Sequence, residues 1–149
     1  MSDDFRHRTS VQVRFRDIDA FGHVNNAVFS TYVEHARITY LREVLQLDPV
    51  NADDRMPLIL GMIKVDYLSP ILLTDRVEVG SRVEWIGRSS ISMSHHLRAA
   101  TGRDLARAGS VLVAYDYQQA RPMPVPDDWR TKLAAYEGRS MQRPKQGDA

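Results

Sequence analysis

The sequence predicts an α+β fold in which one antiparallel β-sheet packs against one long helix. Apolar residues recur at spacings of three or four over about residues 26–47, which is the period of an amphipathic helix. Apolar and polar residues alternate just before this segment and in four segments after it, which is the period of half-buried strands. The order of strand, long helix and four strands favours a single antiparallel sheet over alternating βαβ units.

The first expected strand lies near the start of the chain. Val11, Val13 and Phe15 alternate with polar residues, which is typical of a strand with one buried face. Residues 1–9 are expected to be a loose lead-in to this strand.

The long helix is expected to begin at Asn25 or Asn26, because either side chain can cap a helix N-terminus. Neither Pro nor Gly interrupts the chain from there to about Leu47, and Asp48 and Pro49 end the helix. The apolar face is formed by Phe29, Tyr32, Val33, Ala36, Tyr40, Val44 and Leu45.

Four further strands are expected over residues 58–68, 77–85, 91–99 and 105–117. A hairpin turn at residues 101–104 joins the last two. A proline-rich stretch then leads into a short helix over residues 127–136. We expect residues 1–138 to form a single domain and residues 139–149 to be a disordered C-terminal tail.

Composition restricts the class of protein. With 149 residues, of which 43% are hydrophobic and 26% charged, the chain can form one domain with its own core. The net charge of +1 gives no electrostatic reason to expect nucleic acid or a membrane surface as a partner. The sequence has no cysteine, which excludes disulfides, thiolate metal ligands and a cysteine nucleophile. Neither a signal peptide nor a membrane span is recognisable, so we expect a cytoplasmic protein.

Side chains that can take part in catalysis are concentrated just before the expected helix. Between residues 16 and 26 the chain carries two carboxylates, a glycine, a histidine and two amides, at Asp17, Asp19, Gly22, His23, Asn25 and Asn26. A helix N-terminus has unpaired N–H groups and a partial positive charge. A carboxylate beside such donors can attack a carbonyl carbon, or direct water at it, while the N–H groups polarise the carbonyl oxygen. This segment therefore indicates acyl-transfer chemistry.

The motif Asp-Ile-Asp-Ala-Phe-Gly-His-Val-Asn-Asn-Ala at residues 17–27 is followed by Tyr-Val-Glu-His-Ala-Arg at residues 32–37. Together they resemble the opening of the hotdog-fold acyl-CoA thioesterases of the 4-hydroxybenzoyl-CoA thioesterase-like family. The likeness continues at residues 63–70 and 86–90 and ends near residues 121–126. It implies a hotdog fold, in which the sheet wraps around the helix. It also implies hydrolysis of an acyl-CoA to a carboxylic acid and coenzyme A without cofactor or metal, by a homodimer or homotetramer with active sites between subunits.

Asp19 matches the family's catalytic aspartate, which lies three residues before a glycine. The resemblance implies that Asp19 acts as nucleophile or general base toward the thioester carbonyl carbon, and the sequence leaves both roles open. Asp17 is the competing carboxylate, and we expect it to pair with Arg14, Arg16 or Arg37.

By the same resemblance, backbone N–H groups of Gly22 and His23 polarise the thioester carbonyl. A turn with positive φ is a second reason for a glycine at position 22. Several relatives carry a histidine where this chain has Asn26, so the role of the His23 side chain stays open. Asn25 and Asn26 are expected either to cap the helix or to orient water at the substrate.

Two further segments complete the expected site. Glu34 should form an ion pair with Arg37 three residues later on the helix, with assistance in catalysis as the alternative. Arg88, Ser89 and Ser90 match a family segment that approaches bound acyl-CoA, with an ordinary hairpin turn as the alternative. Because coenzyme A carries phosphates, Arg88 is also a candidate to bind them.

Other hypotheses remain open at this point. Hydrolysis of acyl-carrier-protein thioesters would need a basic rim that docks an acidic carrier. In a non-catalytic acyl-CoA binding or sensing module, Asp19 would be incidental. Tyr32, Tyr40, Met62 and Tyr67 are expected in the core, with an acyl channel as the alternative. The acyl group itself is not specified by the sequence.

Overall fold

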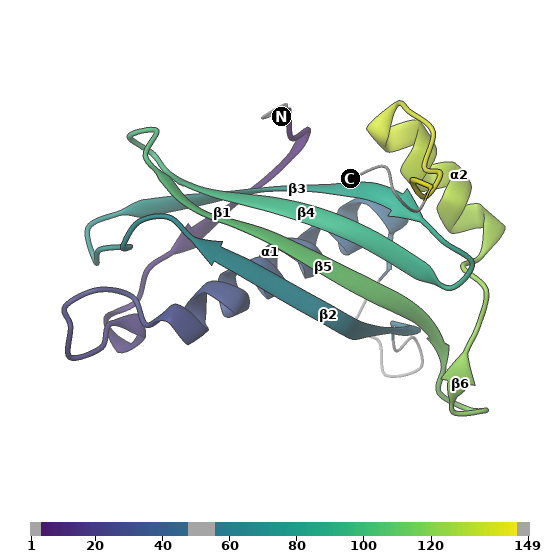
Figure 1. Ribbon diagram of the computed structural model, residues 1–149, viewed down its shortest axis with the longest axis horizontal. Coiled ribbons are helices and arrows are strands. Elements are labelled where there is room, and N and C mark those ends of the chain that lie inside the picture. Colours follow the sequence, from purple (N-terminus) through teal and green to yellow (C-terminus); the bar gives the residue numbers. More distant parts are fainter. Residues whose placement is uncertain (1–3, 48–55, 146–149) are drawn as a thin grey trace.

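The computed structural model describes residues 4–47 and 56–145 and has the expected α+β architecture (Figure 1). Its elements in chain order are β1 (His7–Gln12), the 3-10 helix η1 (Phe15–Asp17), α1 (Asn26–Leu45), β2 (Leu58–Tyr67), β3 (Arg76–Ile86), β4 (Ser90–Ala99), β5 (Asp104–Asp116), β6 (Arg121–Pro122) and α2 (Asp127–Glu137). The residues expected to end the long helix, Asp48 and Pro49, and the end of the expected tail, 146–149, lie outside the described residues.

The strands form one antiparallel sheet in the order β1-β3-β4-β5-β2, and the short β6 pairs with β5. Figure 1 shows α1 running along one face of this sheet, with the loop that precedes α1 at one end of the molecule and α2 at the other. In β2 the pairing with β5 shifts between Leu60 and Met62, which marks a β-bulge. One long helix against one antiparallel sheet is the arrangement expected from the sequence.

The start of the chain differs from the expectation. The first strand begins at His7 rather than at Val11 and ends at Gln12, and Phe15 lies in η1 with 83% of its surface exposed. Phe5 explains why the segment before Val11 is ordered: it is buried against Gly80, where an added Cβ would lie only 2.7 Å from the Phe5 side chain. This contact joins residues 75 positions apart, so local alternation could not reveal it.

The segment after α2 also differs from the expected disordered tail. Residues 139–145 are described, and Gln142 forms a parallel bridge with Ile86 at the end of β3. Met141 is buried, and its carbonyl oxygen accepts a hydrogen bond of 2.7 Å from the Ile86 N–H. The guanidinium of Arg143 lies 4.7 Å from the centre of the Trp85 ring. These contacts with β3 fix a segment whose polar composition suggested disorder.

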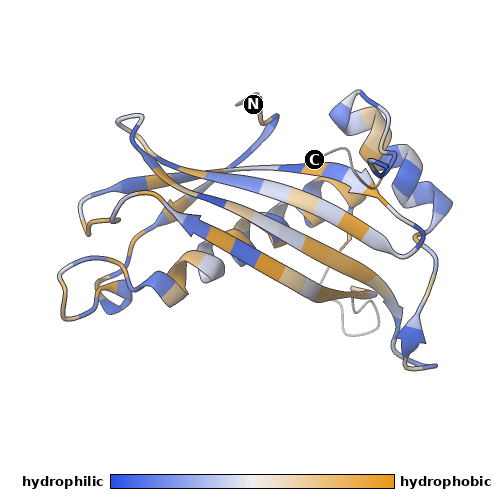
Figure 2. Ribbon diagram, in the orientation of Figure 1, coloured by the Kyte–Doolittle hydropathy of each residue, from blue (hydrophilic) through white to orange (hydrophobic). Residues whose placement is uncertain are grey.

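Two apolar clusters fill the space between α1 and the sheet. The first surrounds the N-terminal half of α1 and includes Phe29 and Val33, and the second surrounds its C-terminal half and includes Tyr40. Helix α2 adds the buried side chains of Trp129 and Leu133 to the second cluster. Figure 2 shows hydrophobic and hydrophilic residues in turn along the strands, as expected where one face of a sheet covers a core.

A polar belt, formed by Arg37, Ser81, His95 and Ser110, separates the two clusters. Each of the four buried residues lies along its helix or strand between a member of the first cluster and a member of the second. His95 Nδ1 is hydrogen-bonded to Ser81 Oγ at 2.9 Å, and His95 Nε2 to Ser110 Oγ at 3.0 Å. A row of side-chain hydrogen bonds therefore crosses three neighbouring strands in the middle of the core.

Burial controls the charge state of the belt. Burial, with a contribution from the nearby Arg37 charge, lowers the pKa of His95 to about 3. A neutral imidazole has one donor and one acceptor nitrogen, so one serine hydroxyl donates to the ring and the other accepts from it. Burial also lowers the pKa of Arg37, and the negative charge of Glu34 opposes that shift.

We predict that His95 makes the stability of the fold depend on pH. An unfolded histidine binds a proton near pH 6.5, whereas folded His95 does so only near pH 3, so the unfolded state binds more protons between these values. This contribution to stability is complete above about pH 6.5 and falls on acidification by at most ~1.4 kcal/mol per pH unit. In urea unfolding between pH 7 and pH 4, His95→Gln should lose less stability on acidification than the wild type.

The exposed histidine of α1 provides the control, since His35→Gln changes no buried group and should retain the wild-type pH dependence. If the free energy of unfolding falls equally on acidification in the wild type and in His95→Gln, the buried imidazole of His95 is not the cause of the pH dependence.

Candidate active site

The loop that connects β1 to α1 is folded back on itself. Ile18 and Val24 form an isolated antiparallel bridge, and the N–H of Asp19 donates to the carbonyl oxygen of His23 at 3.1 Å. The N–H of Gly22 donates to the carbonyl oxygen of Asp19 at 3.0 Å, which closes a turn. Gly22 has a φ of +86°, a conformation that disfavours side chains, although an added Cβ would meet no atom within 4 Å. The requirement for glycine is therefore conformational.

Two hydrogen bonds fix this loop to the rest of the protein, and a third closes the loop itself. The Val24 N–H donates to the Ile71 carbonyl oxygen in the β2–β3 connection at 2.8 Å, and the Asn25 N–H donates to the Asp17 carbonyl oxygen at 2.9 Å. The hydroxyl of Tyr32, in the second turn of α1, donates to Asp17 Oδ2 at 2.7 Å. Burial and the hydrogen bond to Asp17 raise the pKa of Tyr32, so its hydroxyl stays protonated as the donor.

Asp17 and Glu34 do not form the ion pairs with arginine side chains that were expected. Asp17 Oδ2 accepts hydrogen bonds from Tyr32 and from the backbone N–H of Arg14 at 3.0 Å, rather than pairing with an arginine side chain. Arg37 is buried in the polar belt, whereas Glu34 is exposed and lines a groove between β1 and α1. Asp17 therefore anchors the loop to the helix.

The carboxylate of Asp19 is held at both oxygens. Oδ1 accepts a hydrogen bond from the Phe21 N–H at 2.9 Å, and Oδ2 accepts one from Asn25 Nδ2 at 3.1 Å. The other amide atom of the same side chain, Asn25 Oδ1, accepts from the Ala27 N–H at 2.9 Å and caps α1. The capping role expected of Asn25 or Asn26 thus belongs to Asn25.

A cavity of about 480 Å³ lies beside Asp19 at the N-terminus of α1. Its lining residues are Asp19, Phe21, His23, Val24, Asn25, Asn26, Phe29, Tyr67, Leu68, Ser69 and Pro70. Phe29 and Tyr67 form an apolar wall, with ring centres 4.9 Å apart and an angle of 72° between the rings. The Tyr67 hydroxyl donates to the carbonyl oxygen of Asn26 at 3.0 Å, which joins the end of β2 to the first turn of α1. A carboxylate, a helix N-terminus and an apolar wall therefore share one cavity.

Four of the residues expected in the active site line this cavity, namely Asp19, His23, Asn25 and Asn26. Gly22, the remaining expected residue of this loop, is adjacent to the cavity. Its N–H donates to the Asp19 carbonyl oxygen and closes the turn, so it does not point to a substrate. The rings of Phe21 and His23 stack with centres 6.3 Å apart, and Phe21 is 85% exposed.

Arg88, Ser89 and Ser90 lie elsewhere. Arg88 and Ser89 lie in the turn between β3 and β4, and Ser90 begins β4, at the end of the sheet opposite the loop (Figure 1). In this chain they do not line the Asp19 cavity. The Ser89 carbonyl oxygen accepts a hydrogen bond of 2.7 Å from the N–H of Ala114, which fixes the turn against the C-terminal part of β5.

Sequence patterns singled out only part of the apolar side of the cavity. Tyr67 was expected in the core, with an acyl channel as the alternative, and it lines the cavity with 51% of its surface exposed. Phe29 and Leu68 were identified only as members of a helix and a strand. The available signal was Ser69-Pro70 directly after the strand, because proline ends the strand and turns the chain toward the loop.

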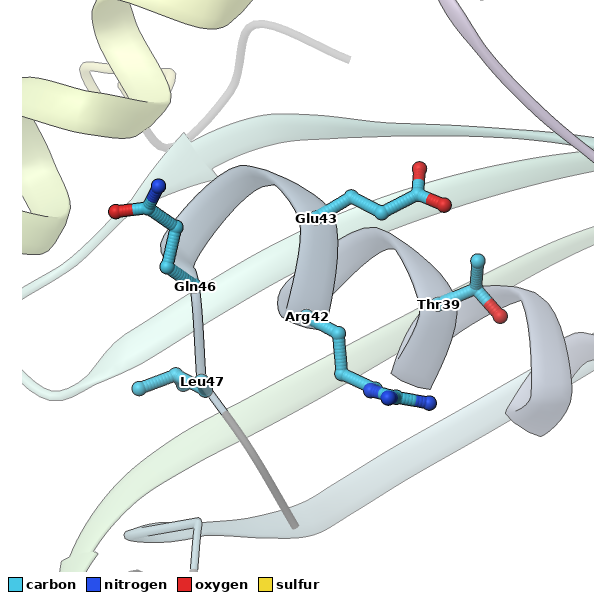
Figure 3. A pocket seen from close by; sticks show the side chains of 5 residues that line it. All are labelled: Thr39, Arg42, Glu43, Gln46 and Leu47. Carbon is cyan, nitrogen blue, oxygen red and sulfur yellow. The ribbon is translucent and has the colours of Figure 1, made fainter. Parts of the chain in front are cut away.

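A separate cavity of about 410 Å³ lies at the C-terminal end of α1 (Figure 3). It is lined by Thr39, Arg42, Glu43, Gln46 and Leu47. Figure 3 shows that these side chains come from one stretch of chain and that Arg42 and Glu43 point in different directions. Glu43 Oε2 is hydrogen-bonded to His7 Nε2 at 2.6 Å. This cavity therefore has no carboxylate held beside helix N–H donors.

Within residues 4–47 and 56–145, no three His, Asp or Glu side chains come together in a group that could hold a metal ion. None of the helices described there is long and apolar enough to cross a membrane.

Comparisons with known proteins identify the family of this chain. The family model described as the thioesterase-like superfamily matches residues 13–133. A solved thioesterase from Thermus thermophilus, complexed with coenzyme A and zinc, is 42% identical, with a TM-score of 0.80 over 93% of this chain and 99% of that chain. The fold and the site thus define a hotdog-fold thioester hydrolase.

Two curated relatives are more distant. The long-chain acyl-CoA thioesterase FadM of Escherichia coli strain K12 is 24% identical over 127 residues, which cover 85% of this chain and 96% of FadM. The chloroplastic acyl-acyl carrier protein thioesterase ATL3 of Arabidopsis thaliana is 26% identical over 132 residues, 87% of this chain and 68% of ATL3. The protein belongs to the thioesterase-like superfamily.

We predict that Tyr32→Phe loosens the active-site loop without disturbing the core. The variant keeps the buried ring and removes the hydrogen bond to the Asp17 carboxylate, which should lower the free energy of unfolding by about 1.5–3 kcal/mol. Amide hydrogen exchange should become faster at Val24 and Asn25, whose N–H groups bond to Ile71 and Asp17.

Tyr40→Phe is the matched control, because the Tyr40 hydroxyl donates to Glu137 Oε1 at 2.9 Å in the second cluster. It should cost similar stability and leave exchange in the loop unchanged. Equal exchange in both variants would contradict a specific role for Tyr32 in holding the loop.

Proposed function

We propose that this protein hydrolyses acyl-CoA thioesters to a carboxylic acid and coenzyme A, with Asp19 as the reacting carboxylate. The observation that carries the proposal is the Asp19 carboxylate, held at both oxygens, in a cavity at the N-terminus of α1. The Thermus thermophilus thioesterase, which is complexed with coenzyme A, supports acyl-CoA as the substrate. A cytoplasmic location remains a prediction from the sequence.

Two routes use the same atoms. As a general base, Asp19 takes a proton from water, and the resulting hydroxide attacks the thioester carbonyl carbon. As a nucleophile, an Asp19 oxygen attacks that carbon itself, and water then hydrolyses the mixed anhydride. In both routes a tetrahedral oxyanion forms, the carbon–sulfur bond breaks and the coenzyme A thiolate takes up a proton. Either route consumes one water molecule for each acid released.

The oxyanion needs donors close to Asp19. We assign this role to backbone N–H groups beside Gly22, at His23 and at Asn26 in the first turn of α1. Both residues line the cavity, and the partial positive charge of the helix N-terminus favours an oxyanion there. The Ala27 N–H donates to Asn25 Oδ1, and the Val28 N–H donates to the Asn25 carbonyl oxygen. These two N–H groups are therefore used in capping the helix and are not assigned to the oxyanion.

A homodimer would complete the site. Strand β2 pairs only with β5 among the described strands, so its other edge is open, and it carries the exposed side chains of Leu60 and Met62. An open, apolar edge favours pairing with another strand. We propose that two copies join antiparallel along β2 around a two-fold axis, which continues the sheet across both subunits. A homotetramer would then be a dimer of such dimers.

This pairing gives Arg88, Ser89 and Ser90 a function. The C-terminal end of β2, at Tyr67, lines the Asp19 cavity. The N-terminal end of β2 lies near the β3–β4 turn, because Leu58 pairs with Ala114, and the Ala114 N–H donates a hydrogen bond to the Ser89 carbonyl oxygen. Antiparallel pairing brings the C-terminal end of one β2 near the N-terminal end of the other. The β3–β4 turn of one subunit then approaches the Asp19 cavity of its neighbour, where Arg88 can bind a coenzyme A phosphate.

Hydrolysis of acyl-carrier-protein thioesters is the second candidate, and it has the support of the similarity to ATL3. The same cavity and the same Asp19 would serve, since both substrates present a thioester on a phosphopantetheine arm. The activity assay described next therefore tests thioesters of coenzyme A and of acyl-carrier protein.

We predict that Asp19→Asn lowers kcat by ~10²-fold or more, because the amide is neither a base nor a nucleophile. The measurement is thiol release from short, medium, long and aromatic acyl-CoAs and from acyl-carrier proteins. Asp17→Asn is the matched control, and it should retain more activity because Asp17 is bonded to Tyr32 and does not line the cavity.

The outcomes separate the hypotheses. Full activity in Asp19→Asn would move the catalytic role to another carboxylate, such as Glu34. Tight acyl-CoA binding without hydrolysis by the wild type would favour the sensing module.

We predict that Leu60→Lys converts the dimer to a monomer, because it places a charge in the apolar β2 edge. Analytical ultracentrifugation measures the change. Leu73→Lys is the matched control, since Leu73 is similarly exposed, 47% against 44%, but lies in the β2–β3 connection. A wild-type monomer, or dissociation in the control alone, would rule out pairing along β2.

A further inference from the structure

The Asn25 side chain connects the two parts of the candidate site. Its Oδ1 accepts the Ala27 N–H at 2.9 Å, and its Nδ2 donates to Asp19 Oδ2 at 3.1 Å. One planar amide therefore spans the N-terminus of α1 and the carboxylate. Of the two N–H groups proposed above to bind the oxyanion, that of Asn26 belongs to the helix, whereas that of His23 belongs to the loop together with the carboxylate. This amide therefore ties the carboxylate to the helix donor.

The orientation of the amide is determined by the cap. With the two amide atoms exchanged, Nδ2 would face the Ala27 N–H and Oδ1 would face the Asp19 carboxylate, which gives one donor–donor and one acceptor–acceptor contact. Capping thus forces the amide donor toward Asp19. The second donor to the carboxylate, the Phe21 N–H on Oδ1, comes from the loop itself and does not relate Asp19 to the helix.

We propose that Asn25 is a positioning residue for thioester hydrolysis, which fixes the Asp19 carboxylate relative to the first turn of α1. This inference rests on the proposed function of Asp19. It assigns the Asn25 side chain to the carboxylate rather than to substrate or water. Such a role matters because a displacement of ~1 Å in a reacting group can cost roughly 10²-fold in rate.

Two substitutions separate positioning from capping. Serine and aspartate are both good N-caps, so Asn25→Ser and Asn25→Asp should keep the helix. Serine is too short to reach Asp19, whereas aspartate keeps the shape of the side chain but places a negative charge where the donor was. The other titratable side chains that line the cavity, His23 and Tyr67, are the same in every variant.

The experiment compares steady-state kinetics as a function of pH, with circular dichroism and thermal unfolding of each variant. Asn25→Ser should lower kcat about 10–100-fold while KM changes little, because one charge-assisted hydrogen bond is lost. Asn25→Asp should in addition move the acidic limb of the pH–rate profile by about one unit or more to higher pH, because a second carboxylate disfavours ionisation of the first. A purely structural cap would leave kcat unchanged in Asn25→Ser, because serine still caps the helix.

Ser30→Ala is the matched control in the first turns of α1. It removes the hydrogen bond from Ser30 Oγ to the Ala27 carbonyl oxygen, away from Asp19, and should leave kcat and the pH profile unchanged.

Three results would overturn the inference. A rise in KM with unchanged kcat in Asn25→Ser would assign Asn25 to substrate binding. Unchanged kinetics in both Asn25 variants would make the residue only a cap, and an acidic limb that stays in place in Asn25→Asp would exclude electrostatic contact with the reacting carboxylate. Failure of the proposed function is recognised separately, since the wild type would then release no thiol, or Asp19→Asn would remain active.

Discussion

The hydrogen bonds at the N-terminus of α1 are the constraint on which the candidate site depends. A helix N-terminus leaves donors without partners, and Asn25 satisfies two of them, the Ala27 N–H with its side chain and the Val28 N–H with its carbonyl oxygen. Its own N–H bonds to the Asp17 carbonyl oxygen, so the residue that starts the helix also closes the loop. The loop, its carboxylate and the remaining helix donors consequently form one rigid unit, which suits a reaction that stabilises developing charge with preorganised groups.

The core beneath this unit is not uniformly apolar. The polar belt crosses the sheet between the two clusters, and His95 is satisfied on both sides by serine hydroxyls. The hydrogen bonds among Ser81, His95 and Ser110 stabilise the fold only while both are formed. A buried polar group that loses its hydrogen-bond partner costs about 1–3 kcal/mol of stability. Arg37 is the belt residue of α1 and lies at the boundary between the two clusters, where its buried Nη1 has no hydrogen-bond partner among the described residues.

Much of this arrangement was predictable because it is local. The period of apolar residues gave α1, β2, β3, β4 and β5 nearly as observed, and the segment from Asp17 to Asn26 brought four expected residues to one cavity. Contacts between distant parts of the chain were not predictable in this way. Phe5 is ordered by Gly80 and Met141 by Ile86, and nothing in the alternation near Phe15 shows that the chain leaves the sheet after Gln12. The partner of Asp17 was missed because Tyr32 fits the apolar face of the helix and its hydroxyl is used only in the folded protein.

The link between the loop and the β2–β3 connection has an evolutionary consequence. The hydrogen bond from Val24 to Ile71 joins backbone atoms only, so it survives a change of side chain at either residue or at the neighbouring positions 68–70. Those neighbouring positions form one wall of the cavity, whereas the carboxylate belongs to the segment 18–24, which is closed by its own bridge between Ile18 and Val24. Under the proposed function, mutational drift in the wall can therefore diversify the acyl groups that are accepted while the chemistry of Asp19 is inherited intact. A lineage built on this plan would change what it hydrolyses far more readily than how it hydrolyses.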